Sequence, residues 1–386
     1  MAYALEEAKE LVIKAGLKLV ESGLVARTWG NISARVSPTQ FVVTPKGRAY
    51  DTLKVDDIVL VNIEDCSYEG EIKPSSEKGI HAAVYAYRSD IHFMIHTHQM
   101  NASVYSVLGQ GILVTGEAVK LLGSYVPNAP YGISSTKKLA RNAAKTIKNN
   151  PDSVAFLLRS HGAFCLGTTM EEAFERSFAL ETVAKDEILR RLAISSLEEV
   201  EKIYLQNHGI NIVGEPILLA TSHRHDDKFV LTSQGKNETY LLSDSSLNGL
   251  AKTHQDLYLA YDINCIVNDP NPAVVAVSSV VKSLRPYIDD VAQIIGVNIK
   301  TAKDSDIVRK AKDRNAVLIQ GSGALCLGAD EEDAKAVAMI LDKQCKSAML
   351  VSLLGLGKPL SRLDAWLQRL VYSHKYSKLK KEKWHA

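Results

Sequence analysis

The stretch Leu157–Ala173, LLRSHGAFCLGTTMEEA, returns near the end of the chain as Leu318–Ala334, LIQGSGALCLGADEEDA. Three further pairs of segments repeat in the same order. They are FVVTPKG at 41–47 with FVLTSQG at 229–235, SSEKG at 75–79 with SSLNG at 245–249, and DIHFMIHTH at 90–98 with DINCIVNDP at 262–270. Four matches in one order indicate a duplicated domain, and a duplication determines how the whole fold is organised.

The length of the chain suits this duplication, because its 386 residues are enough for two domains that each bury a core. We expect one domain over residues 1–200 and its copy, with a basic C-terminal tail, over residues 201–386, joined near residues 195–212. Each copy mixes short strand-like runs with amphipathic stretches, which indicates an α/β fold with helices packed on a central sheet. In the first copy we expect helices over 3–22, 76–88, 134–148 and 169–192, and strands within 31–44, 91–96, 153–158 and 162–167.

The composition gives no basis for general nucleic-acid or membrane binding, since the formal net charge is only +2, with 46% hydrophobic and 23% charged residues. The first residues, MAYALEEAKELVIKAGLKLVESG, indicate an amphipathic helix that contains acids rather than a signal peptide. The apolar runs are too short to cross a bilayer. The five cysteines are odd in number and form no CxxC pair, which fits reduced thiols. We therefore expect a soluble, cytoplasmic protein.

Three histidines and a glutamate in the first copy are candidates for a metal site. On a strand, side chains two residues apart point the same way, so His96 and His98 would project together. His161, in a turn between two strand-like runs, is a candidate third ligand, and Glu77 is a candidate fourth ligand or general base. A His-x-His pair alone is also compatible with a surface or capping role.

The second copy distinguishes these alternatives. At the positions matched to Glu77, His96, His98 and His161 it has Leu247, Asn268, Pro270 and Ser322, while the surrounding apolar framework is kept. Loss of all four together is expected if the four residues act as one unit. The sequence therefore predicts a metal-binding first copy and a second copy without metal ligands.

A second set of residues in the first copy is a candidate anion site. Small polar residues at turns and helix starts, with one lysine, present backbone N–H groups, hydroxyls and a cation to a phosphate. Each of them is also explained singly as a turn residue or a helix cap; Ser75 or Ser76, for example, is a plausible N-cap. The candidates are Gly30, Asn31, Lys46, Gly47, Ser75 and Ser76.

With these residues assembled, the first copy resembles the class II aldolase/adducin family, and within it the fuculose-phosphate aldolases most of all. The motifs TWGNIS, TPKG, PSSE, HTH, PNAPYG and SHG occur over about the first 190 residues in the order and spacing of that family. The resemblance implies an α/β/α domain with a central, mostly antiparallel sheet. The second copy is then a degenerate domain of the same kind.

The resemblance also implies roles for individual residues. Zinc, one ion per chain, would be held by His96, His98 and His161, although other divalent metals also suit these ligands. Glu77 would be the catalytic acid/base and could also approach the metal. The phosphate of the substrate would be bound by turns that contain Thr28, Gly30, Asn31, Lys46, Gly47, Ser75 and Ser76.

The implied activity is that of a lyase that cleaves or forms a carbon–carbon bond in a small ketose phosphate through a metal-stabilised enediolate. Relatives with the same kind of site are pentulose-phosphate 4-epimerases, sugar-acid-phosphate decarboxylases or thio-sugar-phosphate dehydratases, and the sequence does not choose among them. An adducin-like protein without catalysis is a further alternative. It is disfavoured because such members lack the zinc ligands that the first copy has.

One feature of the aldolases is missing, namely a tyrosine that reaches in from a neighbouring subunit. Gly116 or Glu117 stands where we would expect it. The second copy could supply a substitute, or it could only stabilise a homo-oligomer, such as a dimer of two-domain chains that forms a ring of four domains. The candidate substitutes are His254, Tyr258, Tyr261 and Tyr287.

Overall fold

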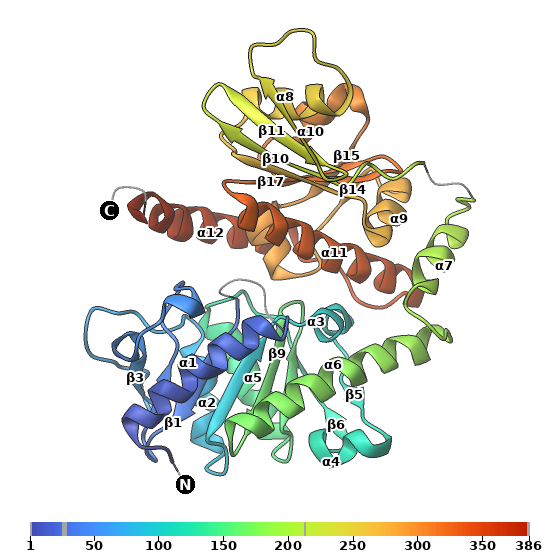
Figure 1. The fold of residues 1–386 in the computed structure, drawn as a ribbon. Helices are drawn as coiled ribbons and strands as arrows, with labels where there is room; N and C mark the ends of the chain where they lie inside the picture. The colour runs from blue at the N-terminus through green and yellow to red at the C-terminus, as the bar shows by residue number, and fades with distance from the viewer. Residues whose placement is uncertain (1, 25–28, 212–213, 384–386) are drawn as a thin grey trace. The chain divides into compact units, whose positions relative to one another are not determined.

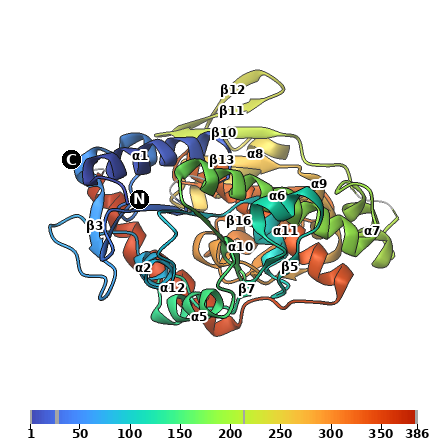
Figure 2. The same cartoon turned by 90° about the horizontal axis from the view of Figure 1, so that it is seen from below.

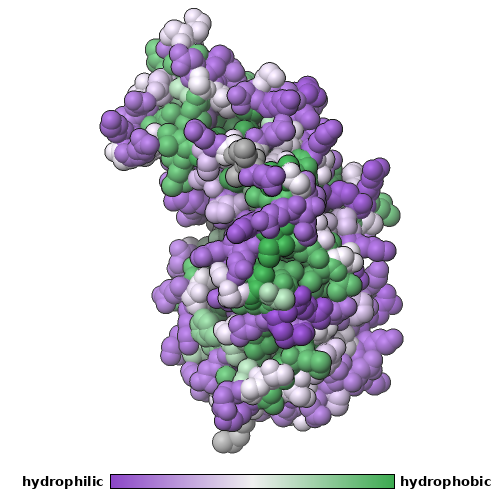
Figure 3. Space-filling model, turned by 90° about the vertical axis from the view of Figure 1, so that its right-hand side faces the viewer, coloured by the Kyte–Doolittle hydropathy of each residue, from purple (hydrophilic) through white to green (hydrophobic). Residues whose placement is uncertain are grey.

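The computed structural model describes residues 2–24, 29–211 and 214–383, and the side chains among them up to residue 373. The chain divides into two compact units, Met1–Arg191 and Leu192–Ala386, and each contains its own sheet (Figure 1). Polar and apolar side chains are interspersed on the surface that Figure 3 shows. Among the described residues, no helix combines the length and apolar character needed to cross a bilayer.

The sheet of the first unit has seven strands in the order β3-β2-β1-β4-β9-β8-β7. Every neighbouring pair is antiparallel except β7 with β8. A two-stranded ribbon, β5 (Ile112–Leu113) with β6 (Tyr125–Val126), stands apart. The strands of the main sheet are β1 (Asn31–Arg35), β2 (Gln40–Val43), β3 (Val59–Asn62), β4 (Phe93–Thr97), β7 (Asn128–Ala129), β8 (Ala155–Leu158) and β9 (Gly162–Gly167).

Helices cover both faces of this sheet. On one face, α1 (Leu5–Glu21) and α6 (Met170–Leu192) pack apolar side chains such as Leu19 and Phe174 against the strands. On the other, α2 (Lys78–Tyr87) and α5 (Lys137–Asn149) do the same, and Figure 2 shows the two pairs of helices on opposite sides. The shorter helices of this unit are α3 (Met100–Ser106), α4 (Val119–Leu122) and the 3-10 turns Tyr50–Thr52, Val55–Asp57 and Gly116–Ala118.

The second unit repeats this plan with an eight-stranded sheet in the order β12-β11-β10-β13-β17-β16-β15-β14. Its pairs are antiparallel except β15 with β16. The strands are β10 (Ala220–His225), β11 (Lys228–Ser233), β12 (Lys236–Leu241), β13 (Cys265–Asp269), β14 (Ser283–Leu284), β15 (Ile299–Ala302), β16 (Ala316–Ile319) and β17 (Gly323–Gly328).

Helices α8 (Gly249–Ala260) and α10 (Ile307–Ala311) contribute to the apolar core on one face of the second sheet. Helices α9 (Pro272–Val280) and α11 (Glu331–Leu354) pack on β17 and its neighbours. The remaining elements are α7 (Glu199–Asn207), the π-helical turn Val291–Ile295, the 3-10 turn Asp304–Asp306 and α12 (Arg362–Lys383).

The register of the strands confirms the tandem pair of α/β/α domains with mostly antiparallel sheets that the sequence predicts. In the first unit His96 lies opposite Phe164, and in the second Asn268 lies opposite Leu325, the residue that the repeat matches to Phe164. One local expectation was wrong. Helix α2 begins at Lys78 with Glu77 as its N-cap, and the Ser75 hydroxyl instead accepts a hydrogen bond from the Glu77 amide at 3.2 Å, one residue before the helix.

Candidate metal centre

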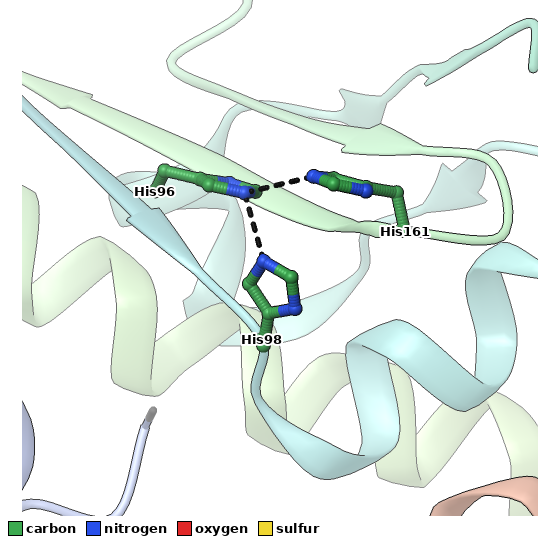
Figure 4. A group of neighbouring side chains, drawn as sticks. All are labelled: His96, His98 and His161. Atoms are coloured by element: carbon green, nitrogen blue, oxygen red, sulfur yellow. Dashed lines mark hydrogen bonds between the residues drawn. The ribbon is translucent and has the colours of Figure 1, made fainter. Parts of the chain in front are cut away.

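The three predicted histidines meet at one point of the first unit (Figure 4). His96 is the fourth residue of β4, His98 follows the end of that strand, and His161 lies in the turn between β8 and β9. The Nε2 atom of His96 is 3.0 Å from Nε2 of His98 and 3.1 Å from Nε2 of His161. All three residues are buried.

A glycine allows the turn that carries His161 to approach β4 closely. A Cβ atom on Gly162 would lie 2.3 Å from the Thr97 carbonyl oxygen and 3.1 Å from Cε1 of His96. A side chain at this position would therefore push the β8–β9 turn away from the strand. Ser160 in the same turn has a φ of 61°, so the turn includes one residue in the left-handed region.

Glu77 completes the cluster from the N-terminus of α2. Its Oε1 lies 3.1 Å from Nε2 of His161, and its Oε2 lies 3.3 Å from Nε2 of His96. Glu77 is also buried, and its Oε2 accepts a hydrogen bond of 3.0 Å from the side-chain amide of Asn31. The predicted ligands therefore come from three different parts of the chain to one buried point.

The spacing of these donor atoms fits a small metal ion. With metal–nitrogen bonds of about 2.0–2.1 Å, tetrahedral zinc separates neighbouring donors by about 3.3 Å. Four of the six separations among the three imidazoles and the carboxylate lie between 3.0 and 3.3 Å, and the ligand atoms of the three histidines all lie within 4.8 Å of one another. Three imidazoles with one carboxylate also form a donor set that zinc accepts.

Two of the histidine side chains, His96 and His161, are oriented by their second ring nitrogens, as in many metal sites. Nδ1 of His96 donates to the Ala163 carbonyl oxygen at 2.9 Å, which leaves the Nε2 lone pair directed at the centre. Burial lowers the pKa of His96 well below its usual value, so this ring is neutral at physiological pH. The Ser134 hydroxyl lies 3.1 Å from Nδ1 of His161.

The carboxyl of Glu77 is ionised in this environment. Burial by itself would raise its pKa, but the facing rings of His161 and His96, with hydrogen bonds from His161 and Asn31, lower the pKa well below its ordinary value. An ionised carboxylate offers lone pairs to a cation, as metal binding requires.

The candidate anion residues are distributed around this centre. Asn31 lies opposite His96 in the sheet, directly after Gly30, whose φ is 100°. Lys46 and Gly47 follow Pro45, which pairs with Pro74 beside Ser75, so this turn and the start of α2 lie together. Ser76 accepts a hydrogen bond of 2.7 Å from Ser135. Thr28, the remaining candidate, lies outside the described residues.

Sequence reasoning missed several residues that support the centre. His81 and Tyr85 on α2 hydrogen-bond Ser33 on β1, and His81 also bonds Asn31. A signal for them was present, because the second copy repeats the spacing as His254 and Tyr258. Ser134 and Ser135, which contact His161 and Ser76, had no such signal.

In the second unit, the position equivalent to the histidine cluster holds a different set of hydrogen bonds. Asn268, at the place of His96, accepts a hydrogen bond of 3.0 Å from Nε2 of His254 and donates one of 2.8 Å to the Leu218 carbonyl oxygen. Ser322 stands at the place of His161, since the amides of both residues bond the carbonyl three residues earlier. Ala220 corresponds to Asn31. It precedes Thr221, which pairs with Val267, so it lies next to Asn268 as Asn31 lies opposite His96.

Two expectations about the second copy were wrong. Leu250, not Leu247, corresponds to Glu77, because His254 bonds Ser222 as His81 bonds Ser33 and Leu250 is four residues before His254. His254 and Tyr258 are also unsuited to serve another subunit as proton donors. Both are buried, and both hydrogen-bond Ser222 inside their own unit. Tyr261 bonds the Val308 carbonyl, and Tyr287 is partly buried.

A family model matches both copies of the repeat. The family model described as Class II Aldolase and Adducin N-terminal domain matches residues 10–188 and 222–349. The 5-deoxy-D-ribulose 1-phosphate aldolase of Bacillus thuringiensis serovar kurstaki is 32% identical over 216 residues, 56% of this chain and 91% of that protein. The methylthioribulose-1-phosphate dehydratase of Pseudomonas fluorescens is 28% identical over 201 residues, 50% of this chain and 97% of that protein. A solved L-fuculose 1-phosphate aldolase is 32% identical and covers 51% of this chain and 93% of its own, with a TM-score of 0.45.

Proposed function

Since the chain belongs to the class II aldolase/adducin family, we propose that its first unit is a metal-dependent lyase acting on a small ketose phosphate. The observation that carries the proposal is the convergence of His96, His98 and His161 at one buried point, with the Glu77 carboxylate 3.1 Å from His161 and 3.3 Å from His96. The reaction would cleave or form a carbon–carbon bond, as the name of the similar 5-deoxy-D-ribulose 1-phosphate aldolase indicates for that protein.

In this proposal His96, His98 and His161 hold one zinc ion per chain. When bound, the metal supplies a positive charge that favours the enediolate form of the substrate over its ketone. Glu77 delivers a proton to the enediolate carbon after cleavage and removes it in the direction of condensation. The Oε1 atom suits this task, because Oε2 is held by the Asn31 amide. The hydroxyl proton on the aldehyde side requires a second group, which we do not assign.

The substrate phosphate would lie at the turns beside this centre. We propose that backbone N–H groups at Gly30, Asn31 and Gly47, with the Lys46 ammonium and the hydroxyls of Ser75 and Ser76, bind it. Thr28 belongs to the same proposed set. The support is that these turns adjoin the ends of β1 and β2 and the start of α2, the elements next to Glu77 and His96.

The second unit has a supporting role in this proposal. We assign catalysis to residues 1–200 and treat residues 201–386 as a degenerate domain, because Asn268, Ser322 and Leu250 replace the ligands. Two chains would form a ring of four domains with two active sites. None of the five cysteines forms a disulfide, which suits a reducing compartment such as the cytoplasm.

A product analysis with several phosphorylated sugars tests the reaction type. The zinc-loaded protein would be incubated with ketose 1-phosphates, and products would be identified by mass spectrometry and NMR. An aldolase releases dihydroxyacetone phosphate and an aldehyde. Loss of water would indicate the dehydratase alternative, loss of CO₂ from a sugar-acid phosphate a decarboxylase, and an inverted carbon at constant mass an epimerase. No conversion by a metal-loaded protein would favour an adducin-like binding role.

A further inference from the structure

A continuous line of hydrogen bonds runs through the buried interior of the first unit and ends at Glu77. The Tyr85 hydroxyl is 2.9 Å from Oγ of Ser33, and Oγ of Ser33 is 2.7 Å from Nδ1 of His81. Nε2 of His81 contacts Oδ1 of Asn31, whose Nδ2 donates to Oε2 of Glu77 at 3.0 Å. No residue of this line is exposed, and His81 is fully buried.

Elementary hydrogen-bond chemistry fixes the direction of this line. The amide nitrogen of Asn31 donates to Oε2 of Glu77, so the amide oxygen, which only accepts, faces Nε2 of His81. Nε2 of His81 therefore carries the proton, and its Nδ1 accepts from the Ser33 hydroxyl. Burial lowers the pKa of His81 to about 3, which agrees with a neutral ring that has one donor and one acceptor.

Aromatic packing holds His81 in this orientation. The Phe164 ring meets the His81 ring edge to face, with centroids 5.1 Å apart, and the Phe41 ring stacks on it at 6.3 Å. Phe164 also stacks on the metal-ligand candidate His96, with centroids 4.5 Å apart. One phenylalanine therefore contacts both the line of hydrogen bonds and the candidate metal centre.

The second unit has the same first part of this line of hydrogen bonds but no carboxylate at its end. Ser222, His254 and Tyr258 repeat the first part of the line, with Oγ of Ser222 2.7 Å from Nδ1 of His254 and 2.6 Å from the Tyr258 hydroxyl. With alanine at the place of Asn31, Nε2 of His254 donates to Asn268 instead. The Ser–His–Tyr group is therefore a feature of the fold, and only the link through Asn31 belongs to the active unit.

We propose that His81 is a positioning residue that acts through Asn31 on the catalytic carboxylate of Glu77. By occupying the amide oxygen of Asn31, His81 prevents the amide from turning, so that Asn31 presents only N–H groups to Glu77. Oε2 is thereby held and Oε1 is kept toward His161. The proposal rests on the proposed function of the metal centre and adds to it His81, whose ring nitrogens bond Ser33 and Asn31.

The test uses His81→Phe and Asn31→Ala in the full chain, with His254→Phe as the matched control. His254→Phe removes the same imidazole from the same Ser–His–Tyr group in the unit without Glu77. The probe is Co²⁺ alone, followed by its visible spectrum and by chelator competition. We expect His81→Phe and Asn31→Ala to weaken Co²⁺ binding about 10–100-fold, as losses of outer hydrogen bonds to metal sites do, and to change the spectrum. His254→Phe should change neither.

Rescue separates positioning from packing. His81→Gln keeps one acceptor for Ser33 and one donor for Asn31, so its affinity for Co²⁺ should return to within a few-fold of that of wild type. Should His81→Phe fail to fold, Asn31→Ala decides, because it leaves the Ser33–His81–Tyr85 group in place. Folded Asn31→Ala protein with wild-type affinity and spectrum would overturn the proposal. If wild type itself bound no Co²⁺, the proposed function would fall instead.

Discussion

Replacing Gly162 by alanine tests the geometry that brings His161 to His96. The new methyl group would lie 2.3 Å from the Thr97 carbonyl oxygen, a backbone atom that can move only with its strand. Overpacking of this kind costs about 1–3 kcal/mol. For a unit of this size, about 1 kcal/mol corresponds to a shift in Tm of roughly 2–4 °C. We therefore expect Tm to fall by about 2–12 °C and zinc affinity to fall with it, since the turn that carries His161 is displaced.

The second unit offers the matched control for this variant. Gly323 occupies the equivalent place, and its added Cβ would lie 2.4 Å from the Asp269 carbonyl oxygen. Its φ of 129° adds backbone strain to the alanine variant. Gly323→Ala should lower Tm at least as much but leave the zinc content unchanged. Calorimetry and zinc titration measure the two effects. The reasoning would be refuted if Gly162→Ala bound zinc like wild type, or if Gly323→Ala lost it.

Three further predictions concern single polar groups. Glu77→Gln should lower turnover about 10²–10⁴-fold, the usual contribution of an acid/base group, even at a zinc concentration that saturates His96, His98 and His161, as checked by atomic absorption. Asn268→Ala leaves the buried Nε2–H of His254 without its acceptor and should cost about 1–3 kcal/mol in a denaturation experiment, without loss of zinc. Burial lowers the pKa of His81 to about 3 and that of His254 to about 4, both below the unfolded value. The contribution of each histidine to stability is therefore full above about pH 6.5 and is lost at about 1.4 kcal/mol per pH unit below it. When the free energy of unfolding is plotted against pH from 7.5 to 5, its slope should be smaller in His81→Gln than in wild type, and an unchanged slope would contradict this.

The fold and the cluster of three histidines could be predicted because the duplication supplies its own comparison. His96 and His98 stand out against Asn268 and Pro270 in an otherwise similar strand, and strand periodicity then places the two imidazoles on one side. His161 could be identified because the apolar residues around it repeat around Ser322. No spacing rule gives the distance from Glu77 to these rings, which depends on how α2 packs on the sheet.

The remaining details depend on contacts between residues distant in sequence. Asn31 was predicted only as a phosphate-binding residue, but its side chain joins Glu77 to His81, a link across β1 and α2 that no local pattern reveals. The match of Glu77 with Leu247 followed the letters SSEKG and SSLNG. The buried hydrogen bond of His254 to Ser222 shows that, when α8 is aligned with α2, Leu250 corresponds to Glu77. Leu250 packs against the core of the second unit. Similar letters at the start of a helix were a weaker guide than the buried hydrogen bonds in its middle.

The most direct test is the zinc content per chain of protein purified without added metal, for wild type and for a His96→Ala, His98→Ala double variant. The account predicts one zinc ion per wild-type chain and none in the double variant, with the second unit still folded. Zinc retained by the double variant, or wild type that neither contains nor takes up a divalent metal, would contradict the assignment of the metal centre to the first unit.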